Sequence, residues 1–372
     1  MPTSLVRIMA LARKELLAVL KDRRARLSLL LPALVQTLVF GYGASYDLNR
    51  VPYVVFSRDT GAPAAALLAR FAGAPLFRQV ASVQRQRELR AAIDARRALL
   101  GIRIPSDFSR RLAAGRPADV QFIADGRNSN TAGTALGYAQ TVVNHFNAEW
   151  RATHALPQPP VRLLERAWYN PNLVTRWQMV PGLIGTLTLL QTLLLTAMSV
   201  AREREQGTFD QLLVTPLRPV EIMAGKALPA MLIGIAQASG VLLVAQLWFR
   251  IPFQGSLFTL YAGLLCFVVS AVGIGLVVSA FCHTMQQAML FAFMLIMPFS
   301  LLSGLATPIA NMPAPLRYFT LVNPLRYAID LAERVYLEGA GLALLWPDIW
   351  PLALIAALAL GAASWMFRHR LQ

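Results

Sequence analysis

The sequence predicts an α-helical integral membrane protein with six transmembrane helices and an inserted extracytoplasmic α/β domain. Three observations predict this fold class. Of the 372 residues, 56% are hydrophobic and 15% are charged, which is unlike a soluble domain. Six segments without Asp, Glu, Lys or Arg are long enough to cross a bilayer, which takes about 20 residues. One polar stretch with strand and helix patterns separates the first of these segments from the other five.

The six expected spans are joined by short connections, except after the first and before the last. They are residues 27–46, 179–201, 227–248, 257–282, 288–309 and 349–367. The first is too long for the apolar region of a cleaved signal peptide, so we expect it to be retained as an anchor. Cys266 and Cys282 lie in or beside the fourth span and are expected to be buried free thiols.

Basic residues flank the apolar part of the chain on both sides. They are Arg7, Arg13, Lys14, Lys21, Arg23, Arg24, Arg26, Arg368 and Arg370. Lys and Arg are enriched on the cytoplasmic side of membrane proteins, so an even number of spans places both termini in the cytoplasm. We therefore expect a multi-pass membrane protein. The net charge of +16 includes no basic run interleaved with aromatic residues, so membrane lipid and not nucleic acid is the expected partner.

Residues 1–26 precede the first span and have the spacing of an amphipathic helix. Their apolar positions are Leu5, Ile8, Met9, Ala12, Leu16, Val19 and Leu20, while Arg7, Lys14 and Lys21 lie on another face. Such a helix is suited to the cytoplasmic membrane interface. A helix that simply continues into the first span explains the pattern equally well.

Residues 47–178 are expected to form the extracytoplasmic domain. Residues 51–56, 98–105 and 119–124 have the pattern of short buried strands, and a weaker one covers residues 76–83. Helical spacing between the strands predicts a small layered α/β fold. Ser106 or Asp107 is expected to cap the helix that follows the third strand, and a long helix is expected from Ser129 to about Arg151.

The five spans of residues 179–372 are interrupted by a charged segment, residues 202–226, with the sequence REREQGTFDQLLVTPLRPVEIMAGK. Gly207 permits a sharp turn, and Thr208 with Gln211 has the spacing of a capping box. The pattern predicts one short helix that ends at Pro216 and a second that begins at Pro219 and ends at Lys226. This segment is either a solvated loop whose charges fix the topology or a docking surface for a soluble partner, which its capping and acidic residues favour.

The sequence carries no pattern for nucleotide binding or catalysis. Gly225-Lys226 is followed by Ala227 and has no glycine five residues before it, so it is not a phosphate-binding loop. No catalytic or metal-binding residue is expected. The spans contain no ionisable side chain that would couple transport to an ion. Their neutral polar groups are expected to join helices, and Gln191, Thr192 and Ser300 are weaker candidates for a substrate path.

Six pieces of the chain resemble the permease subunits of ABC-2 type exporters, in the same order. They are ARKEL (12–16), IPSDFSRRL (104–112), DGRNSNTA (125–132), the whole of residues 202–226, LLSGLATPIANMP (301–313) and NPLRYAIDL (323–331). The arrangement is most similar to the drug-export branch, with a large periplasmic domain between the first and second spans. The resemblance implies a protein of the bacterial inner (plasma) membrane that exports a hydrophobic or amphipathic, drug-like compound.

The resemblance also implies partners. A separate ATP-binding-cassette ATPase would hold ATP and Mg, this chain would bind no cofactor, and a second permease subunit would complete a homo- or heterodimer. A periplasmic adaptor and an outer-membrane channel are further possible partners. The residues that would form the coupling segment on the ATPase are Glu203, Glu205, Gly207, Thr208, Leu212, Pro216, Glu221, Gly225 and Lys226. Relatives more often have an aliphatic residue and Glu at Phe209-Asp210.

Two other functions remain open on the sequence alone. One is a secondary transporter that is powered without an ATPase, against which the charge-free spans argue. The other is a membrane-anchored sensor or assembly factor that binds a ligand with its extracytoplasmic domain. The permease would depend on a partner ATPase, whereas the secondary transporter and the sensor or assembly factor would not.

Overall fold

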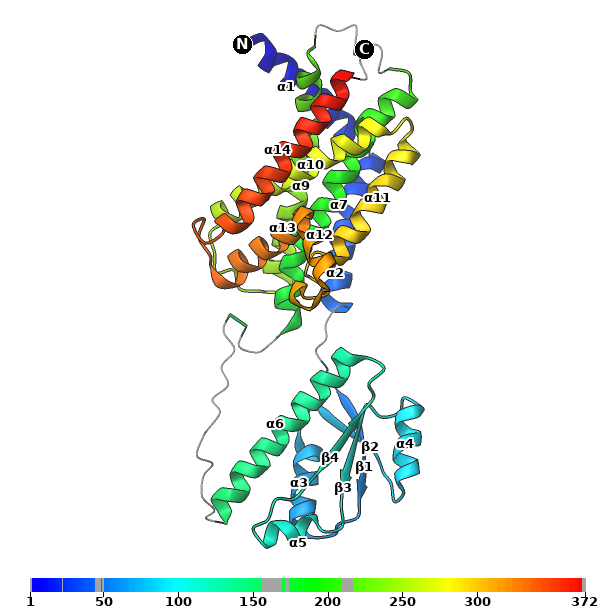
Figure 1. Ribbon diagram of the computed structural model, residues 1–372, viewed down its shortest axis with the longest axis vertical. Coiled ribbons are helices and arrows are strands. Elements are labelled where there is room, and N and C mark those ends of the chain that lie inside the picture. Colours follow the sequence, from blue (N-terminus) through cyan, green and yellow to red (C-terminus); the bar gives the residue numbers. More distant parts are fainter. Residues whose placement is uncertain are drawn as a thin grey trace. The chain divides into compact units, whose positions relative to one another are not determined.

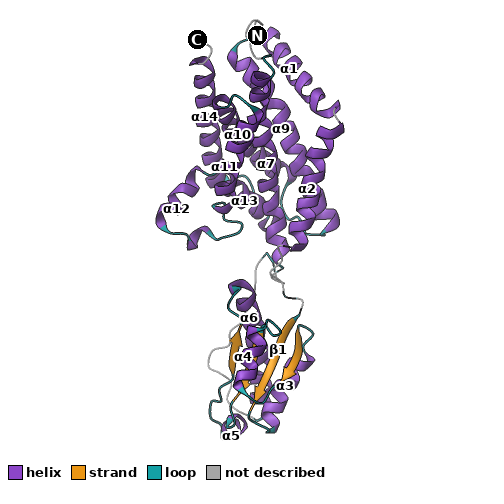
Figure 2. Ribbon diagram, turned by 90° about the vertical axis from the view of Figure 1, so that its right-hand side faces the viewer, coloured by secondary structure: helices purple, strands orange, loops and turns teal. Residues whose placement is uncertain are grey.

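The computed structural model describes residues 2–21, 23–43, 48, 50–154, 169–170, 174–208 and 217–369. The chain forms two compact units. One comprises Met1–Ser45 with Ala167–Gln372, and the other comprises Tyr46–Arg166. Among the described residues, strands occur only in the second unit, while the first is built from helices (Figure 2).

The helical unit contains seven helices of more than fifteen residues within its described part. They are α1 (Pro2–Lys21), α2 (Arg23–Gly43), α7 (Thr175–Glu205), α9 (Pro219–Leu243, extended by the π-helical turn Val244–Trp248), α10 (Leu257–Phe281), α11 (Met285–Leu301) and α14 (Trp346–His369). Shorter elements join α11 to α14. They are Ile309–Asn311, α12 (Ala314–Phe319), Thr320–Val322, α13 (Pro324–Glu333) and Arg334–Glu338. The N-terminal end of α1 and the C-terminal end of α14 lie at the same end of this unit (Figure 1).

Four helices are long and apolar enough to cross a membrane, and they cover the second, third, fourth and sixth expected spans. They are Thr175–Glu205, Val220–Trp248, Leu257–Phe281 and Trp346–Arg368. The first and fifth expected spans overlap with shorter apolar helices, Leu31–Gly43 and Met285–Leu301. The helix expected to reach residue 309 ends at Leu301 because the chain turns there, with Gly304 in the left-handed region at φ +100°.

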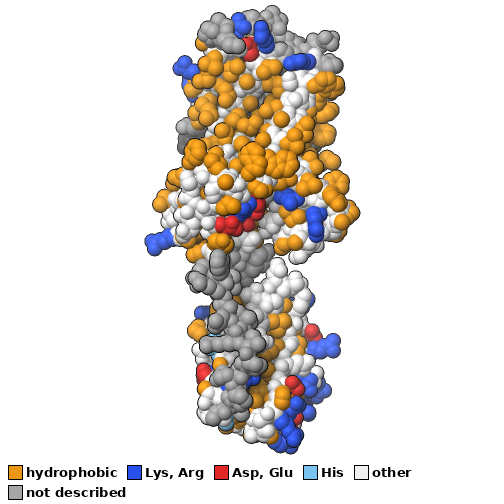
Figure 3. All heavy atoms as spheres, turned by 60° about the vertical axis from the view of Figure 1, so that its left-hand side comes forward, with side chains coloured by type: hydrophobic (Ala, Val, Ile, Leu, Met, Phe, Trp, Pro, Cys, Tyr) orange, Lys and Arg blue, Asp and Glu red, His pale blue; other side chains and the backbone are white. Residues whose placement is uncertain are grey.

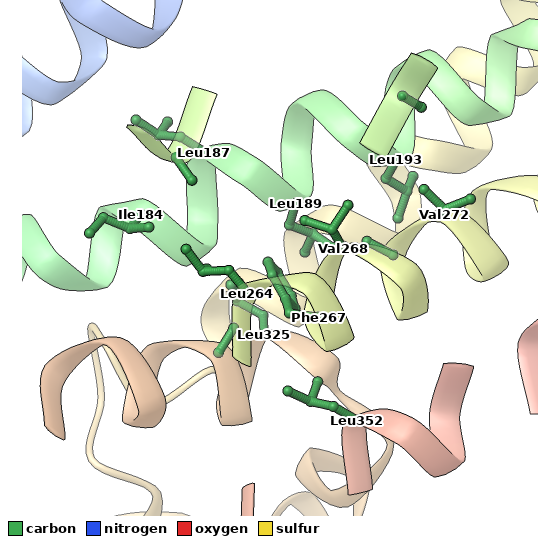
Figure 4. Packing of buried hydrophobic residues seen from close by; sticks show 14 of the residues in the cluster. Ile184, Leu187, Leu189, Leu193, Leu264, Phe267, Val268, Val272, Leu325 and Leu352 are labelled. Carbon is green, nitrogen blue, oxygen red and sulfur yellow. The ribbon is translucent and has the colours of Figure 1, made fainter. Parts of the chain in front are cut away.

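Helix α10 forms the centre of the helical unit. Leu264, Phe267 and Val268 are almost fully buried between side chains of α7, α13 and α14, among them Leu325 and Leu352 (Figure 4). Glycines bring the helix axes close together. A Cβ atom at Gly263 would lie 2.2 Å from a methyl carbon of Leu331, and one at Gly275 would lie 2.7 Å from Cβ of Thr196. Small residues allow membrane helices to approach this closely.

The α/β unit contains a four-stranded sheet with strand order β2-β1-β3-β4. The strands are β1 (Val51–Ser57), β2 (Phe77–Ser82), β3 (Leu100–Ile104) and β4 (Gln121–Ala124). The central strand β1 is parallel to β2 and β3, and β4 is antiparallel to β3. All four strands predicted from the sequence are confirmed, and the two central strands, β1 and β3, are the ones that are mostly buried.

Four helices cover the sheet. They are α3 (Ala62–Gly73), α4 (Gln86–Asp94), α5 (Phe108–Ala113) and α6 (Ser129–Thr153). Tyr53, Phe71 and Phe77 form an aromatic cluster in one core, and Phe56 packs with Leu89 of α4 in the other. The long helix predicted from Ser129 is confirmed, with Asn128 accepting a hydrogen bond from the backbone N of Thr131.

The expected cap of α5 is wrong. Neither Ser106 nor Asp107 provides a side-chain cap. The carboxylate of Asp59 instead accepts hydrogen bonds from the backbone N and the hydroxyl of Ser109, at 2.9 and 2.7 Å. The helix terminus is therefore satisfied by a residue from the loop after β1, which local sequence cannot reveal.

Candidate functional site

The segment expected to carry the function begins where α7 ends and continues into α9. Helix α7 ends at Glu205, and Gly207 turns the chain with φ +66°. The hydroxyl of Thr208 donates a weak hydrogen bond to the carbonyl of Glu203 at 3.4 Å. The first predicted short helix, with Leu212 and Pro216, lies outside the described residues.

The second predicted short helix is part of α9. Pro219 begins this helix, and the carboxylate of Glu221 accepts a hydrogen bond from the backbone N of Arg218 at 2.9 Å. The helix then continues to Leu243 without a break at Lys226, so the predicted end at Lys226 is wrong. The reason is that Lys226 is neutralised inside the protein and does not need to end the helix in solvent.

Lys226 lies in a buried triad with Glu203 and Glu15. Its Nζ lies 2.8 Å from Oε2 of Glu203 and 3.3 Å from Oε1 of Glu15. Its side chain is 0% exposed, and the side chains of Glu203 and Glu15 are 10% and 22% exposed. Ser199 also offers its hydroxyl and carbonyl oxygens at 3.4 Å. A buried ammonium group requires such partners, so the buried triad fixes α1, α7 and α9 to one another.

A second set of contacts holds α1 against α9. The Ser4 hydroxyl donates a short hydrogen bond to the Glu221 carboxylate, and Arg7 lies 4.0 Å from the same carboxylate. Gly225 faces α1 directly, because a Cβ atom there would lie 2.7 Å from a methyl carbon of Leu11. The absence of a side chain at Gly225 is therefore what allows α1 to pack on α9.

The last turn of α7 also holds the connection between α10 and α11. The carboxylate of Glu205 accepts a hydrogen bond from the backbone N of Met285, at the start of α11, at 2.7 Å. Arg204 donates to the carbonyl oxygens of Ala280 and Cys282, at the end of α10, at 3.1 Å. An acid at a helix start and a base at a helix end both complement the helix dipoles.

The expected coupling residues fall into two groups. Of those that the structure describes, Glu203, Glu221, Gly225 and Lys226 are buried and Thr208 is half-buried, while Glu205 and Gly207 are exposed. The three buried charges face partners inside the protein, so they present no charge to another protein in this conformation.

Glu15 and Ser4 were not expected in the site. Glu15 is the only carboxylate of α1, among Arg7, Arg13, Lys14 and Lys21, and this isolated position could have indicated a buried partner. Ser4 offers no comparable signal.

Comparison with known proteins identifies the family. A family model described as "ABC-2 family transporter protein" matches residues 25–365. The chain belongs to the ABC-2 transporter family. It is a permease subunit of an ABC exporter, and the family implies an ATPase partner.

Two Escherichia coli (strain K12) relatives show how far the similarity extends. The "Probable multidrug ABC transporter permease YbhR" is 40% identical over 365 residues, which is 98% of this chain and 99% of the relative. The "Inner membrane transport permease YhhJ" is 32% identical over 288 residues, or 76% of each chain. The similarity to YbhR therefore includes both compact units of the permease.

The weaker substrate-path residues of the permease do not form one site. Thr192 is buried, and a Cβ atom at Gly234 of α9 would lie 2.4 Å from its hydroxyl oxygen. Gln191 and Ser300 are partly exposed, and among the described residues no hydrogen bond joins any of the three to another. In this conformation Thr192 of α7 packs against α9.

Proposed function

We propose that this permease exports a hydrophobic or amphipathic, drug-like compound from the bacterial cytoplasm or inner membrane. Its relative YbhR carries the name of a probable multidrug permease. A separate ATPase would bind ATP and Mg, and this chain would bind no cofactor. A second permease subunit would complete the pathway, and a periplasmic adaptor with an outer-membrane channel would receive the compound at the α/β unit.

The observation that carries this proposal is the buried triad. It ties α1, α7 and α9 together at the end of the helical unit where residues 202–226 connect two long apolar helices. A force on that connection would therefore move three helices as one body. An ATPase seated there would transmit its closure to the helices that line the pathway.

The proposed topology has six spans, with both termini in the cytoplasm. The N-terminal end of α1 and the C-terminal end of α14 lie at the same end of the helical unit (Figure 1). In Figure 3, hydrophobic side chains cover the middle of this unit, and Lys and Arg side chains gather near its ends. This distribution suits a hydrocarbon layer with polar boundaries. In this topology, residues 47–178 form the extracytoplasmic domain.

The surface that meets the ATPase would be formed by exposed residues beside the buried triad. Arg218 is exposed at the start of α9, whereas Glu203, Glu221 and Lys226 are buried and would position this surface. The two roles can be separated, because Arg218 takes no part in the ion pairs of the buried triad, and its electrostatic effect on Glu221 comes from an exposed charge, which contributes little to stability.

The test is co-purification of the ATPase with Arg218→Glu, together with export. We expect this exposed charge reversal to weaken both, while the permease keeps its thermal stability. Arg250→Glu is the matched control, because Arg250 is also exposed but follows the opposite end of α9. ATPase recovery equal to that of the control, or export that continues without any ATPase, would contradict the proposed function.

A further inference from the structure

A cavity of about 570 Å³ lies between α1, α7 and α9, next to the buried triad. Drug-sized ligands occupy pockets of roughly 300–1,000 Å³. One part of its wall is apolar and includes Val19, Leu195 and Ile233. Another part is polar and includes Lys14, Arg202 and Gln206. The cavity therefore offers two different surfaces to one ligand.

The charges around this cavity are not balanced. Glu15 and Glu203 also line it, but both carboxylates are already paired with Lys226. Lys14 and Arg202 are exposed, and in the described part of the chain neither forms an ion pair. The lining thus carries three cations, Lys14, Arg202 and Lys226, against two carboxylates, so its net charge is positive.

The two walls together select the ligand. A cation would meet Lys14 and Arg202 and would have to compete with Lys226 for the carboxylates, so like charges oppose it. A small hydrophilic anion would leave the apolar wall in contact with water. A molecule with an anionic head and an apolar tail satisfies both walls.

We propose that this cavity binds a negatively charged amphiphile. Its phosphate or carboxylate head lies at Lys14 and Arg202, and its apolar tail lies along Val19, Leu195 and Ile233. Arg and Lys bind such heads with charge-assisted hydrogen bonds. The binding tests below use the permease without the ATPase, so failure of this inference and failure of the proposed function are distinguishable.

The first test measures binding to the full-length permease in nanodiscs of phosphatidylcholine. Dodecyl phosphate is the probe, and inorganic phosphate and dodecyltrimethylammonium are the comparators, each titrated by calorimetry. We expect saturable binding of dodecyl phosphate and binding at least about 10-fold weaker for each comparator. Equal or tighter binding of dodecyltrimethylammonium would overturn the inference.

The second test removes the two cations. In Lys14→Gln/Arg202→Gln we expect dodecyl phosphate affinity to fall about 10-fold, because two exposed charge contacts are lost. The control Arg13→Gln/Lys21→Gln removes the same charge from exposed positions of α1 that do not line the cavity. A loss no larger than that of the control would overturn the inference. Ala18→Trp, which fills the cavity from an exposed position of α1, should weaken binding without removing charge.

The third test identifies the source of the amphiphile. Phosphatidylglycerol is included in the nanodisc, and the permease is examined by native mass spectrometry. Phosphatidylglycerol that is retained, competes with dodecyl phosphate and is lost in Lys14→Gln/Arg202→Gln supports the proposal with a membrane lipid as occupant. Saturable dodecyl phosphate binding without retained phosphatidylglycerol supports it with a soluble amphiphile as occupant.

Discussion

At the scale of single residues, burial decides what each charge does. Glu203, Glu205 and Lys226 belong to the same sequence pattern, but the fold buries two of them and leaves the third exposed. Glu203 and Lys226 neutralise each other inside the helical unit, while Glu205 is exposed and accepts a hydrogen bond from the backbone of Met285. A charge pattern can therefore mark a functional segment without showing which of its members meet a partner.

Removal of one acid from the buried triad should be costly. Glu203→Ala leaves Lys226 buried with Glu15 as its remaining carboxylate partner. Loss of one partner of a buried ion pair costs about 3–5 kcal/mol, so a large fall in the thermal unfolding midpoint of the purified permease is expected. Arg202→Ala, an exposed neighbour in the same helix, is the control. Equal midpoints for the two variants would show that the buried triad does not stabilise the fold.

At the scale of elements, the packing of α1 on α9 is the feature that places the buried triad. It depends on Gly225, which leaves room for Leu11, and on the contacts of Glu221 with Ser4 and Arg7. The amphipathic spacing of α1 indicated a helix with one apolar face. Much of that face stays exposed, as at Leu5, Met9 and Leu20, and α1 meets α9 through other, mostly polar side chains that the spacing did not single out.

Gly225→Ala should displace α1. The new Cβ atom would lie 2.7–2.9 Å from three side-chain carbons of Leu11, so the helices must separate or Leu11 must move. We expect faster cleavage of α1 by protease and weaker export, with partial recovery in Gly225→Ala/Leu11→Ala.

The control for this prediction lies in the same helix. A Cβ atom at Gly240 would meet nothing within 4 Å, so Gly240→Ala should be tolerated and should raise helix stability by up to about 1 kcal/mol. If Gly225→Ala is cleaved no faster than Gly240→Ala, the close approach of α1 to α9 does not hold the helix in place.

At the scale of the whole molecule, family membership and chemistry agree on a permease that obtains its energy from another protein. The family match covers residues 25–365. The buried triad does contain ionisable groups, but Lys226 forms an ion pair with each of the two acids. This arrangement leaves no free carboxylate there to carry a coupling ion, in contrast to the relays of ion-driven transporters.

The proposed topology predicts where reporters function. Green fluorescent protein fused to either terminus should fluoresce, because it folds in the cytoplasm. Alkaline phosphatase inserted after Gly115, at an exposed turn of the α/β unit, should be active, because it requires export. An inactive phosphatase at this position, together with export by the fusion protein, would exclude the proposed orientation.

The sequence by itself determined the membrane class, the positions of the long apolar helices, the four strands and the segment 202–226, because these depend on local hydrophobic and turn patterns. Only the tertiary structure decided that Lys226 is buried with Glu203 and Glu15, that Asp59 caps α5 and that α9 continues through Lys226. Glu15 and Lys226 are separated by 211 residues. Contacts over such distances depend on which helix faces meet, and periodicity along one helix does not specify its neighbour.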